Sequence, residues 1–401
     1  IRRPGSDEKP VFSMGQLIWR YHPEKRRYEI FAEGGGNTFG LEIDSQGRIY
    51  SGHNGGDTRG FHYVQGGYYR KGFGKHGSLS NPFTFGYFES MAHHSVPRFT
   101  HTFVIYEGAA LPEKYQGRLF GIAPLQSHVV MSDVARRGSS FKTSDVGRPL
   151  ESADPWFRPV DIQVGPDGAI YVADMYEQRI DHASHYQGRI DRESGRIYRL
   201  RASGDWERPE VRLGDLATPA LIEQLKHPNK WYRQTALRLL ADRRDPAGVP
   251  LLRSMLREEA GQPALEALWA LNLTGGLDAD SIERALDHEN PQVRLWMVRL
   301  LCDDGQVREA MARRLASLAE TELNVEVRGQ LACSARRLPV EESLPIVRSL
   351  VLHSEDTDDV FLPLLLWWAL EDKATSDREA LLEWLADPSL WRQRMMREHL
   401  L

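Results

Sequence analysis

Residues 40–54 read GLEIDSQGRIYSGHN, which is the pattern of a short strand, a tight turn at Gln46-Gly47 and a second strand. Residues 159–175, PVDIQVGPDGAIYVADM, repeat this pattern with a turn at Asp167-Gly168. The form Gly-x-[Ile/Leu]-[Tyr/Phe] occurs at 47–50, 117–120, 168–171 and 195–198. Because one hairpin cannot bury its own faces, its repetition favours a radial arrangement such as a β-propeller.

The hairpins account for about three propeller blades, whereas closed propellers usually have four to eight. Either further blades precede Ile1 or this part folds as an open arc. The polar start IRRPGSDEKP has neither an initiator Met nor a signal-like apolar core, so we expect an internal fragment. Residues 54–91 and 132–156 are expected to be long insertions that project from the blades, where function is often placed on a rigid all-β scaffold.

The composition changes near residue 205, where glycine becomes rarer and Leu, Ala, Arg and Glu recur at helical spacing. HPNKWYRQTALRLL at 227–240 resembles HENPQVRLWMVRLL, which begins at His288. The arginines of this pattern are Arg233, Arg294, Arg328 and Arg392. Their spacing favours HEAT-like helix pairs, in which the early arginine ties one repeat to the next through a turn carboxylate such as Asp287 or Glu289.

The sequence therefore predicts a mixed two-domain fold. An all-β partial β-propeller is expected at residues 1–203, a linker at 204–214 and an all-α HEAT-like solenoid at 215–401. A chain of 401 residues is long enough for two or three domains that each bury a core. The seven tryptophans between 231 and 391 lie on or near apolar helix faces and are expected in the core rather than in a stacking platform.

Composition and cysteine usage exclude several classes of function. A net charge of −5 points to neither nucleic acid nor an anionic membrane surface as a partner. Cys302 and Cys333 are too far apart for a disulfide framework, a zinc knuckle or a CxxCH haem motif. The longest apolar run, residues 360–370, contains a proline and is shorter than the roughly 20 residues that cross a bilayer, so we expect a buried helix.

A family resemblance rests on the run TFGLEIDSQGRIYSGHNGGDTRGFHYVQGGYYRKGFGKHG, followed by RFTHTFVIYEG, LPEKYQGRLFG, WFRPVDIQVGPDGAIYVADMYEQRIDH and GRIYRL. Over roughly residues 15–200 the chain resembles the propeller domain of the membrane-bound dehydrogenases of planctomycetes and verrucomicrobia. Those proteins are associated with the cell envelope, often end in a c-type cytochrome module and have propellers similar to quinoprotein sugar dehydrogenases. The early blades and the cytochrome segment of that family have no counterpart in this sequence.

The resemblance implies oxidation of a sugar or alcohol, with pyrroloquinoline quinone and a divalent cation such as Ca²⁺ in the intact protein. A cytochrome supplied elsewhere would accept the electrons, and the protein would be periplasmic or bound to the cell envelope. The alternative is a non-catalytic scaffold that binds glycans or proteins, with a protein partner on the solenoid.

Polar residues at strand ends are the candidates for a site, since one face of a propeller gathers them near the axis. A hydride-abstracting site needs a general base, for which His53 and His62 are candidates together with Asp57. Cations and polar groups that could hold an acidic cofactor are Arg59, Arg158 and Asp161. The structural alternative is that Arg158, Asp161 and Asp174 tie blade turns together while the histidines cap loops.

A second cluster, Asp174, Asp181, His182 and His185, has residue types that ligate divalent metals. The alternative is a polar surface loop, where short histidine-containing stretches are common. His93, His94 and His101 are weaker metal candidates, because residues 99–105 alternate like a strand and His101 is then expected to face a neighbouring blade.

Overall fold

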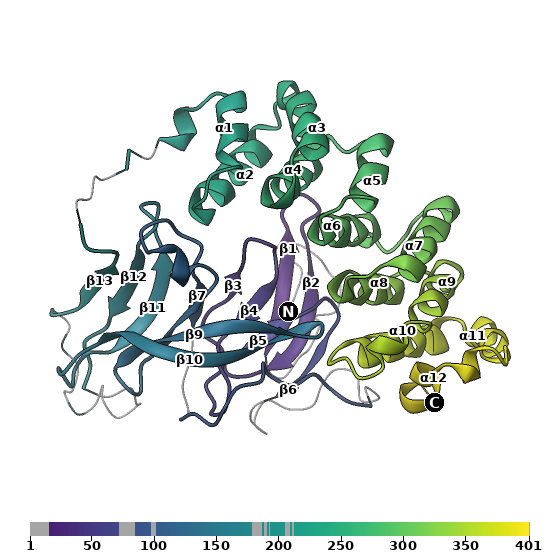
Figure 1. Cartoon of the computed structure of the whole chain (residues 1–401), viewed down its shortest axis with the longest axis horizontal. Coiled ribbons are helices and arrows are strands. Elements are labelled where there is room, and N and C mark those ends of the chain that lie inside the picture. Colours follow the sequence, from purple (N-terminus) through teal and green to yellow (C-terminus); the bar gives the residue numbers. More distant parts are fainter. Residues whose placement is uncertain are drawn as a thin grey trace.

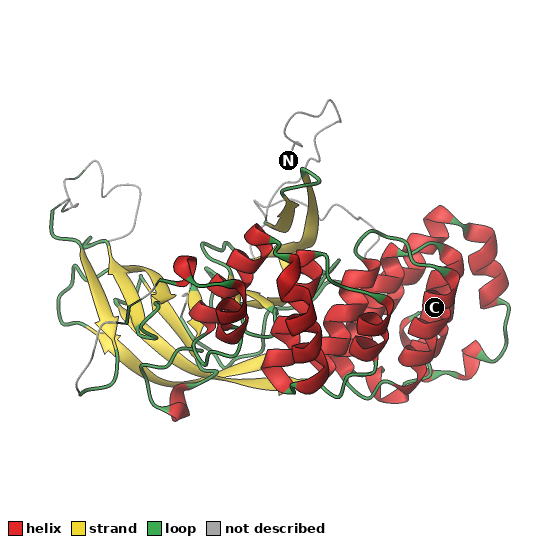
Figure 2. Cartoon of the chain, turned by 90° about the horizontal axis from the view of Figure 1, so that it is seen from above, coloured by secondary structure: helices red, strands yellow, loops and turns green. Residues whose placement is uncertain are grey.

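A computed structural model describes residues 16–71, 85–97, 102–178, 187, 191, 193–204, 209–210 and 212–400. Strands occupy the first half of the chain and helices the second, as the change in composition predicts (Figure 1). The helices form an arc along one side of the sheets, and Figure 2 shows the same separation of strands from helices after a quarter turn. Within these described ranges, no helix is long and apolar enough to span a bilayer.

The described strands of the β half form four separate sheets. The first contains β1 (Leu17–His22), β2 (Arg27–Gly35) and β6 (Tyr68–Lys71), and the second contains β3 (Glu42–Ile43), β4 (Ile49–Ser51) and β5 (Phe61–Tyr63). The third contains β7 (Phe103–Ile105), β8 (Leu119–Ala123), β9 (His128–Arg137) and β10 (Ser140–Glu151). The fourth contains β11 (Pro159–Val164), β12 (Ile170–Asp174) and β13 (Arg196–Leu200).

The repeated Gly-x-[Ile/Leu]-[Tyr/Phe] form leads into a strand at each of its positions, namely β4, β8, β12 and β13. The first three glycines, Gly47, Gly117 and Gly168, have φ values of +74°, +73° and +75°. This left-handed conformation favours glycine, so the motif marks a turn followed by a strand. The hairpins predicted at 40–54 and 159–175 are confirmed as the antiparallel pairs β3–β4 and β11–β12.

The propeller itself is not confirmed, because the described strands form no closed ring of sheets. One cause is β6, which does not extend the sheet of β5 but pairs in parallel with β2 of the first sheet. The interpretation of 132–156 as an insertion is wrong. Most of this segment belongs to β9 and β10, an antiparallel hairpin with its turn at 137–140.

The helical half consists of six helix pairs. Their bounds are α1 (Thr218–Gln224), α2 (Lys230–Arg243), α3 (Val249–Glu258), α4 (Gly261–Thr274), α5 (Ala279–Leu286), α6 (Pro291–Cys302), α7 (Glu309–Thr321), α8 (Val325–Arg337), α9 (Val340–Leu350), α10 (Leu362–Ser376), α11 (Arg378–Leu385) and α12 (Arg394–His399). The predicted buried helix at 360–370 is confirmed as α10, in which Trp368 is 1% exposed. The second helices of the first five pairs supply contacts to the sheets, and we call them the inner helices.

Three inner helices begin with the same device. An asparagine caps the helix by accepting a backbone N–H two residues on, at Asn229, Asn290 and Asn324. Four residues after each cap, Arg233, Arg294 and Arg328 donate back to carbonyls just before the helix.

The same arginines donate to carboxylates of the next repeat, which confirms the predicted tie between repeats. The carboxylates are Glu266, Glu322 and Asp356. The expectation that Asp287 or Glu289 fills this role is wrong, since Asp287 pairs with Arg314 at the surface and Glu289 offers only its carbonyl to Arg294. Arg392 is exposed in a single 3₁₀ turn and takes no part in the device.

The first two sheets and the helices share one apolar core. Side chains of the first two sheets, including Phe31, Phe61 and Tyr68, belong to the same apolar cluster as the helices. The rings of Phe88 and Phe361 are 4.2 Å apart between centroids. The tryptophans of the helical half lie in or against this cluster, as predicted. A separate core lies between the third and fourth sheets.

Candidate functional site

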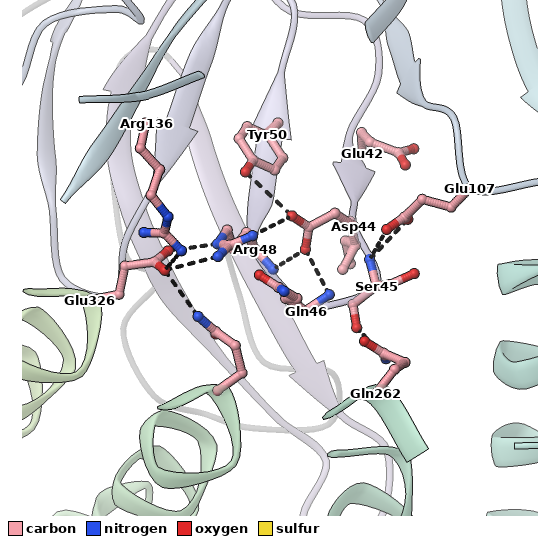
Figure 3. A network of polar contacts seen from close by, with 12 residues as sticks. Glu42, Asp44, Ser45, Gln46, Arg48, Tyr50, Glu107, Arg136, Gln262 and Glu326 are labelled. Atoms are coloured by element: carbon pink, nitrogen blue, oxygen red, sulfur yellow. Dashed lines mark hydrogen bonds and ion pairs between the residues drawn. The ribbon is translucent and has the colours of Figure 1, made fainter. Parts of the chain in front are cut away.

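The β3–β4 turn at 44–48 lies in a network of polar contacts between the sheets and the helices (Figure 3). Asp44 Oδ1 accepts the backbone N–H groups of Gln46 and Arg48, each at 2.9 Å, which closes the turn. Gly47 completes it in the left-handed conformation. The sequence pattern Asp-x-x-Gly therefore builds a rigid projection at the end of the hairpin.

This turn enters the space between the inner helices. Trp296 Nε1 of α6 donates to the Gln46 carbonyl at 2.8 Å, and Gln262 Nε2 of α4 donates to the Ser45 carbonyl at 2.6 Å. A Cβ atom on Gly47 would overlap with Cζ2 of Trp296. Only glycine therefore fits at this position in both conformation and space.

Glu326 at the start of α8 joins the turn to a second hairpin. Arg48 binds its carboxylate through two contacts of 2.6 and 2.8 Å, and Arg136 of β9 also donates to it. Gln292 of α6 donates at 2.9 Å. Burial alone would raise the pKa of Glu326, but hydrogen bonds and charge from Arg48, together with Arg136, lower it to about 2.

A second ionic group lies beside the turn, where Lys230 of α2 contacts Glu42, Glu107 and the Ile43 carbonyl. Glu107 also accepts the Ser45 backbone N–H at 2.9 Å. Burial raises the pKa of Glu42 to about 7, although the charge of Lys230 opposes this. The arrangement fixes the hairpin with groups from β3, from the segment after β7 and from α2.

Four other turns or hairpins also dock on the helical half. The contacts join Gly165 and Pro166 to Asn229, Gly66 to Arg336, Ser139 to Asp359, and Arg20 to Asp303. Each of the four sheets therefore reaches the helices. The inner helices are occupied by the chain's own β half.

A small cavity of about 40 Å³ lies beneath the turn, with room for about two water molecules. Its lining includes Gln46, His62 and Gln292, each with a buried side-chain nitrogen or oxygen that makes no hydrogen bond to a described residue. Arg299 also lines it, between the rings of Phe31 and Trp296, and burial lowers the pKa of Arg299 to about 10. Buried polar groups of this kind are satisfied by ordered water.

The two candidate histidines lie on opposite faces of β5. His62 is buried against Tyr50, Phe141 and Phe361, and burial lowers its pKa to about 3. His53 instead packs edge-on against Phe61, the preceding residue of the strand. Because alternate residues of a strand face opposite sides, the histidines do not converge on one reacting atom.

Arg158 is held within its own part of the molecule. Its guanidinium donates to the carbonyls of Pro124, Pro155, Glu177 and Gln178 and to the Ser127 hydroxyl. These contacts join three segments of the chain, 124–127, 155–158 and 177–178.

The neighbouring acidic candidates also serve local structure. Asp174 Oδ1 accepts the backbone N–H groups of Arg158 and Tyr176, and Asp161 Oδ1 accepts that of Ile162. These contacts agree with the hypothesis that the residues stabilise turns, which is the alternative to a cofactor site. Of the proposed metal ligands, Asp181, His182 and His185 lie outside the described residues, as does His101.

Asp57 and Arg59 belong to a loop that pairs with residues 91–96. The Asp57 backbone N–H donates to the Val96 carbonyl, and the Val96 N–H donates to the Asp57 carboxylate, each at 3.1 Å. Arg59 forms a two-point ion pair with Asp145 of β10. His93 Nε2 lies 3.6 Å from the same carboxylate.

Pyrroloquinoline quinone, the cofactor that the resemblance implies, carries several carboxylates and needs free cations around an open space. The candidate residues named from the sequence do not form such a space. Arg59 is committed to Asp145 and Arg158 to five acceptors, and the cavity beside His62 has room only for water. We derive no step through a quinone.

Residues 5–204 match the family model described as a domain of unknown function, DUF7133, and residues 218–284 match the model of HEAT repeats. None of the curated proteins matches the chain. The DUF7133 match includes the 44–48 turn, and the HEAT match covers α1 to α4 and most of α5.

Two solved structures show weak likeness. A Thermus thermophilus protein, described provisionally as an oxidoreductase (glucose dehydrogenase), has 19% identity and a TM-score of 0.30, over 43% of this chain and 46% of its own. This chain thus spans less than half the length of that protein. A designed armadillo repeat protein in complex with the peptide (KR)4 has 15% identity and a TM-score of 0.29, over 46% of this chain and 99% of its own. These values identify no function.

Proposed function

We propose that the DUF7133 and HEAT parts of this chain act together as a non-catalytic binding scaffold for a glycan or protein partner. The helical repeats hold the sheets in one position, and the assembled unit presents its remaining surfaces. The observation that carries this proposal is the insertion of the 44–48 turn between α4, α6 and α8. The inner helices are thereby engaged within the chain, so a partner of the repeats would bind elsewhere on them.

The contacts of the candidate catalytic residues support the same proposal. His53 and His62 pack against aromatic rings on opposite faces of a strand. Arg59 forms an ion pair with Asp145, and Arg158 donates hydrogen bonds to backbone carbonyls. Side chains committed in this way stabilise an architecture and leave little capacity for a substrate. The alternative is the activity that the resemblance implies, a sugar or alcohol dehydrogenase of the cell envelope.

The test compares turnover with binding on the purified chain. Dye reduction is measured with a panel of sugars and alcohols, in the presence of Ca²⁺ and pyrroloquinoline quinone, and glycan binding is measured on an array. We expect saturable binding to a glycan class without quinone-dependent dye reduction or thermal shift. If no glycan binds, purified envelope proteins are tested for a saturable complex by the same criterion.

Variants connect the result to the residues. The scaffold proposal expects His53→Ala and His62→Ala to change stability without removing any activity, because there is none to remove. Quinone-dependent dye reduction that either variant abolishes, while the folded fraction measured by circular dichroism stays the same, would overturn the scaffold in favour of the dehydrogenase.

A further inference from the structure

A group of metal-ligating side chains lies away from the interface between sheets and helices. His93 and His94 follow the loop contact at Met91, and Asp145 lies on β10. One ligand atom from each of these three residues lies within 4.8 Å of the other two. The three do not belong to the cluster at 174–185 that the sequence singles out.

The environment of His93 fixes where its lone pair points. Nδ1 lies 2.8 Å from the Thr143 carbonyl oxygen, which can only accept, so Nδ1 carries the proton. Nε2 is then unprotonated, and it is buried without a hydrogen bond to any described residue, in a side chain that is 0% exposed. Histidines that bind metals commonly donate their other ring N–H to a carbonyl in this way.

Asp145 faces this lone pair with a negative charge. Its Oδ1 lies 3.6 Å from His93 Nε2, so two acceptors point at one another with no proton between them. A tetrahedral metal with bonds of about 2.0–2.1 Å holds two ligand atoms roughly 3.3–3.4 Å apart. The separation is therefore close to that of two ligands on one ion.

Hydrogen bonds orient the carboxylate, as is usual for a metal ligand. Ser132 Oγ donates to Asp145 Oδ1 at 2.7 Å, and Arg59 donates to both oxygens. Burial opposes ionisation of Asp145, but these donors keep its pKa below the usual value. The Arg59 charge also repels a second cation, so an ion here would exchange rather than be held permanently.

We propose that His93 Nε2, Asp145 and His94 form a binding site for a divalent transition-metal ion of the Zn²⁺ or Co²⁺ type. Two imidazoles and a carboxylate form a donor set that suits such ions. His93 and Asp145 are the preset ligands. His94 is exposed and stacked on His93 with centroids 4.1 Å apart, so it can rotate to complete the set.

Co²⁺ is the probe, because its visible absorption reports nitrogen ligation. The full chain, free of any histidine tag and stripped with chelator, is titrated with Co²⁺, and Zn²⁺ competition gives the relative affinities. We expect one equivalent to bind, with affinity at least about tenfold weaker in His93→Ala and in His94→Ala. His399→Ala, which changes an exposed histidine of α12, should leave the titration unchanged.

His94 keeps the test decisive, since replacing an exposed side chain does not threaten the fold. Unchanged Co²⁺ affinity in both His93→Ala and His94→Ala would overturn the proposal. So would loss of the absorption in a His182→Ala/His185→Ala double variant when the His93 and His94 variants retain it, because the ion would then belong to the other cluster.

Discussion

Glu326 shows how one residue can depend on parts of the chain that sequence does not connect. Its main partner, Arg48, is 278 residues away. The Asn-x-x-x-Arg helix starts were predictable because cap and arginine are local. The role of Glu326 was not predictable, because an acidic residue in the first turn of a helix is common. Here it binds arginines of the β half. Asp145 was missed for the same reason, although the sequence names His93 and His94 as weaker metal candidates.

We expect Glu326→Gln to lower the free energy of unfolding at pH 7 by about 3 kcal/mol, since its pKa falls from 4.5 to about 2 on folding. A depressed carboxyl pKa contributes stability above the unfolded value, and this contribution is lost as pH falls toward 2. The difference between wild type and variant in urea unfolding should therefore be smaller at pH 3 than at pH 7.

The matched control for this prediction is Glu309→Gln, which breaks an exposed ion pair with Arg313 on α7. Such pairs contribute about 0–1 kcal/mol, so this variant should resemble wild type at both pH values. A Glu326→Gln deficit that does not depend on pH would show that the lost stability comes from packing rather than charge.

Elements with local patterns were predictable, whereas their pairings were not. The β3–β4 and β11–β12 hairpins follow from strand, Gly turn and strand, and the helix pairs follow from apolar spacing. The β9–β10 hairpin was mistaken for an insertion because its outer half, ARRGSSFKTSDVGRPLE at 135–151, is largely polar and exposed. The parallel pairing of β2 with β6 joins segments that are separated in the chain by the three strands of the second sheet, which no local pattern indicates.

Gly47→Ala and Gly117→Ala form a matched pair that separates backbone strain from docking. Both glycines have nearly the same positive φ, but the Cβ would meet Trp296 at Gly47 and nothing within 4 Å at Gly117. We expect Gly117→Ala to cost about 1 kcal/mol and Gly47→Ala roughly 1–3 kcal/mol more, as measured by urea unfolding. Equal costs would mean that the turn does not need its close approach to the helix.

The arginine device gives a second prediction for the helices. Arg328 and Asp356 form a buried pair with two contacts of 2.6 Å, so Arg328→Met leaves a buried carboxylate and should cost about 3–5 kcal/mol. Arg313→Met removes only a surface pair and should cost at most about 1 kcal/mol. Thermal unfolding of both variants at pH 7 measures the contrast, which similar costs would contradict.

At the scale of the whole molecule, the shared core implies that the first two sheets and the helices unfold together. Phe31, Tyr68 and Trp368 lie in one apolar cluster, and the polar contacts of the 44–48 turn cross the same boundary. The two-part organisation was predictable from the change in composition. The common core was not predictable, because the apolar residues of a segment do not indicate which other segment they will pack against.

Native-state hydrogen exchange tests this cooperativity. Amides of β4 and of α6 should open with the same free energy, and Gly47→Ala should lower both by the same amount. Amides of β12, which belongs to the separate core, serve as the internal reference. Loss of protection in β4 while α6 remains protected would show that the two halves unfold independently.

The contacts of particular turns with particular inner helices limit how this chain can change length. An open solenoid can gain or lose a repeat, because each repeat contacts only its neighbours. Here the 165–168 turn is matched to α2, the 44–48 turn to α4 and α6, and the 64–67 turn to α8. Deleting one helix pair would shift every later helix by one position against the sheets. The positions of these turns on the sheets therefore constrain the number of helix pairs.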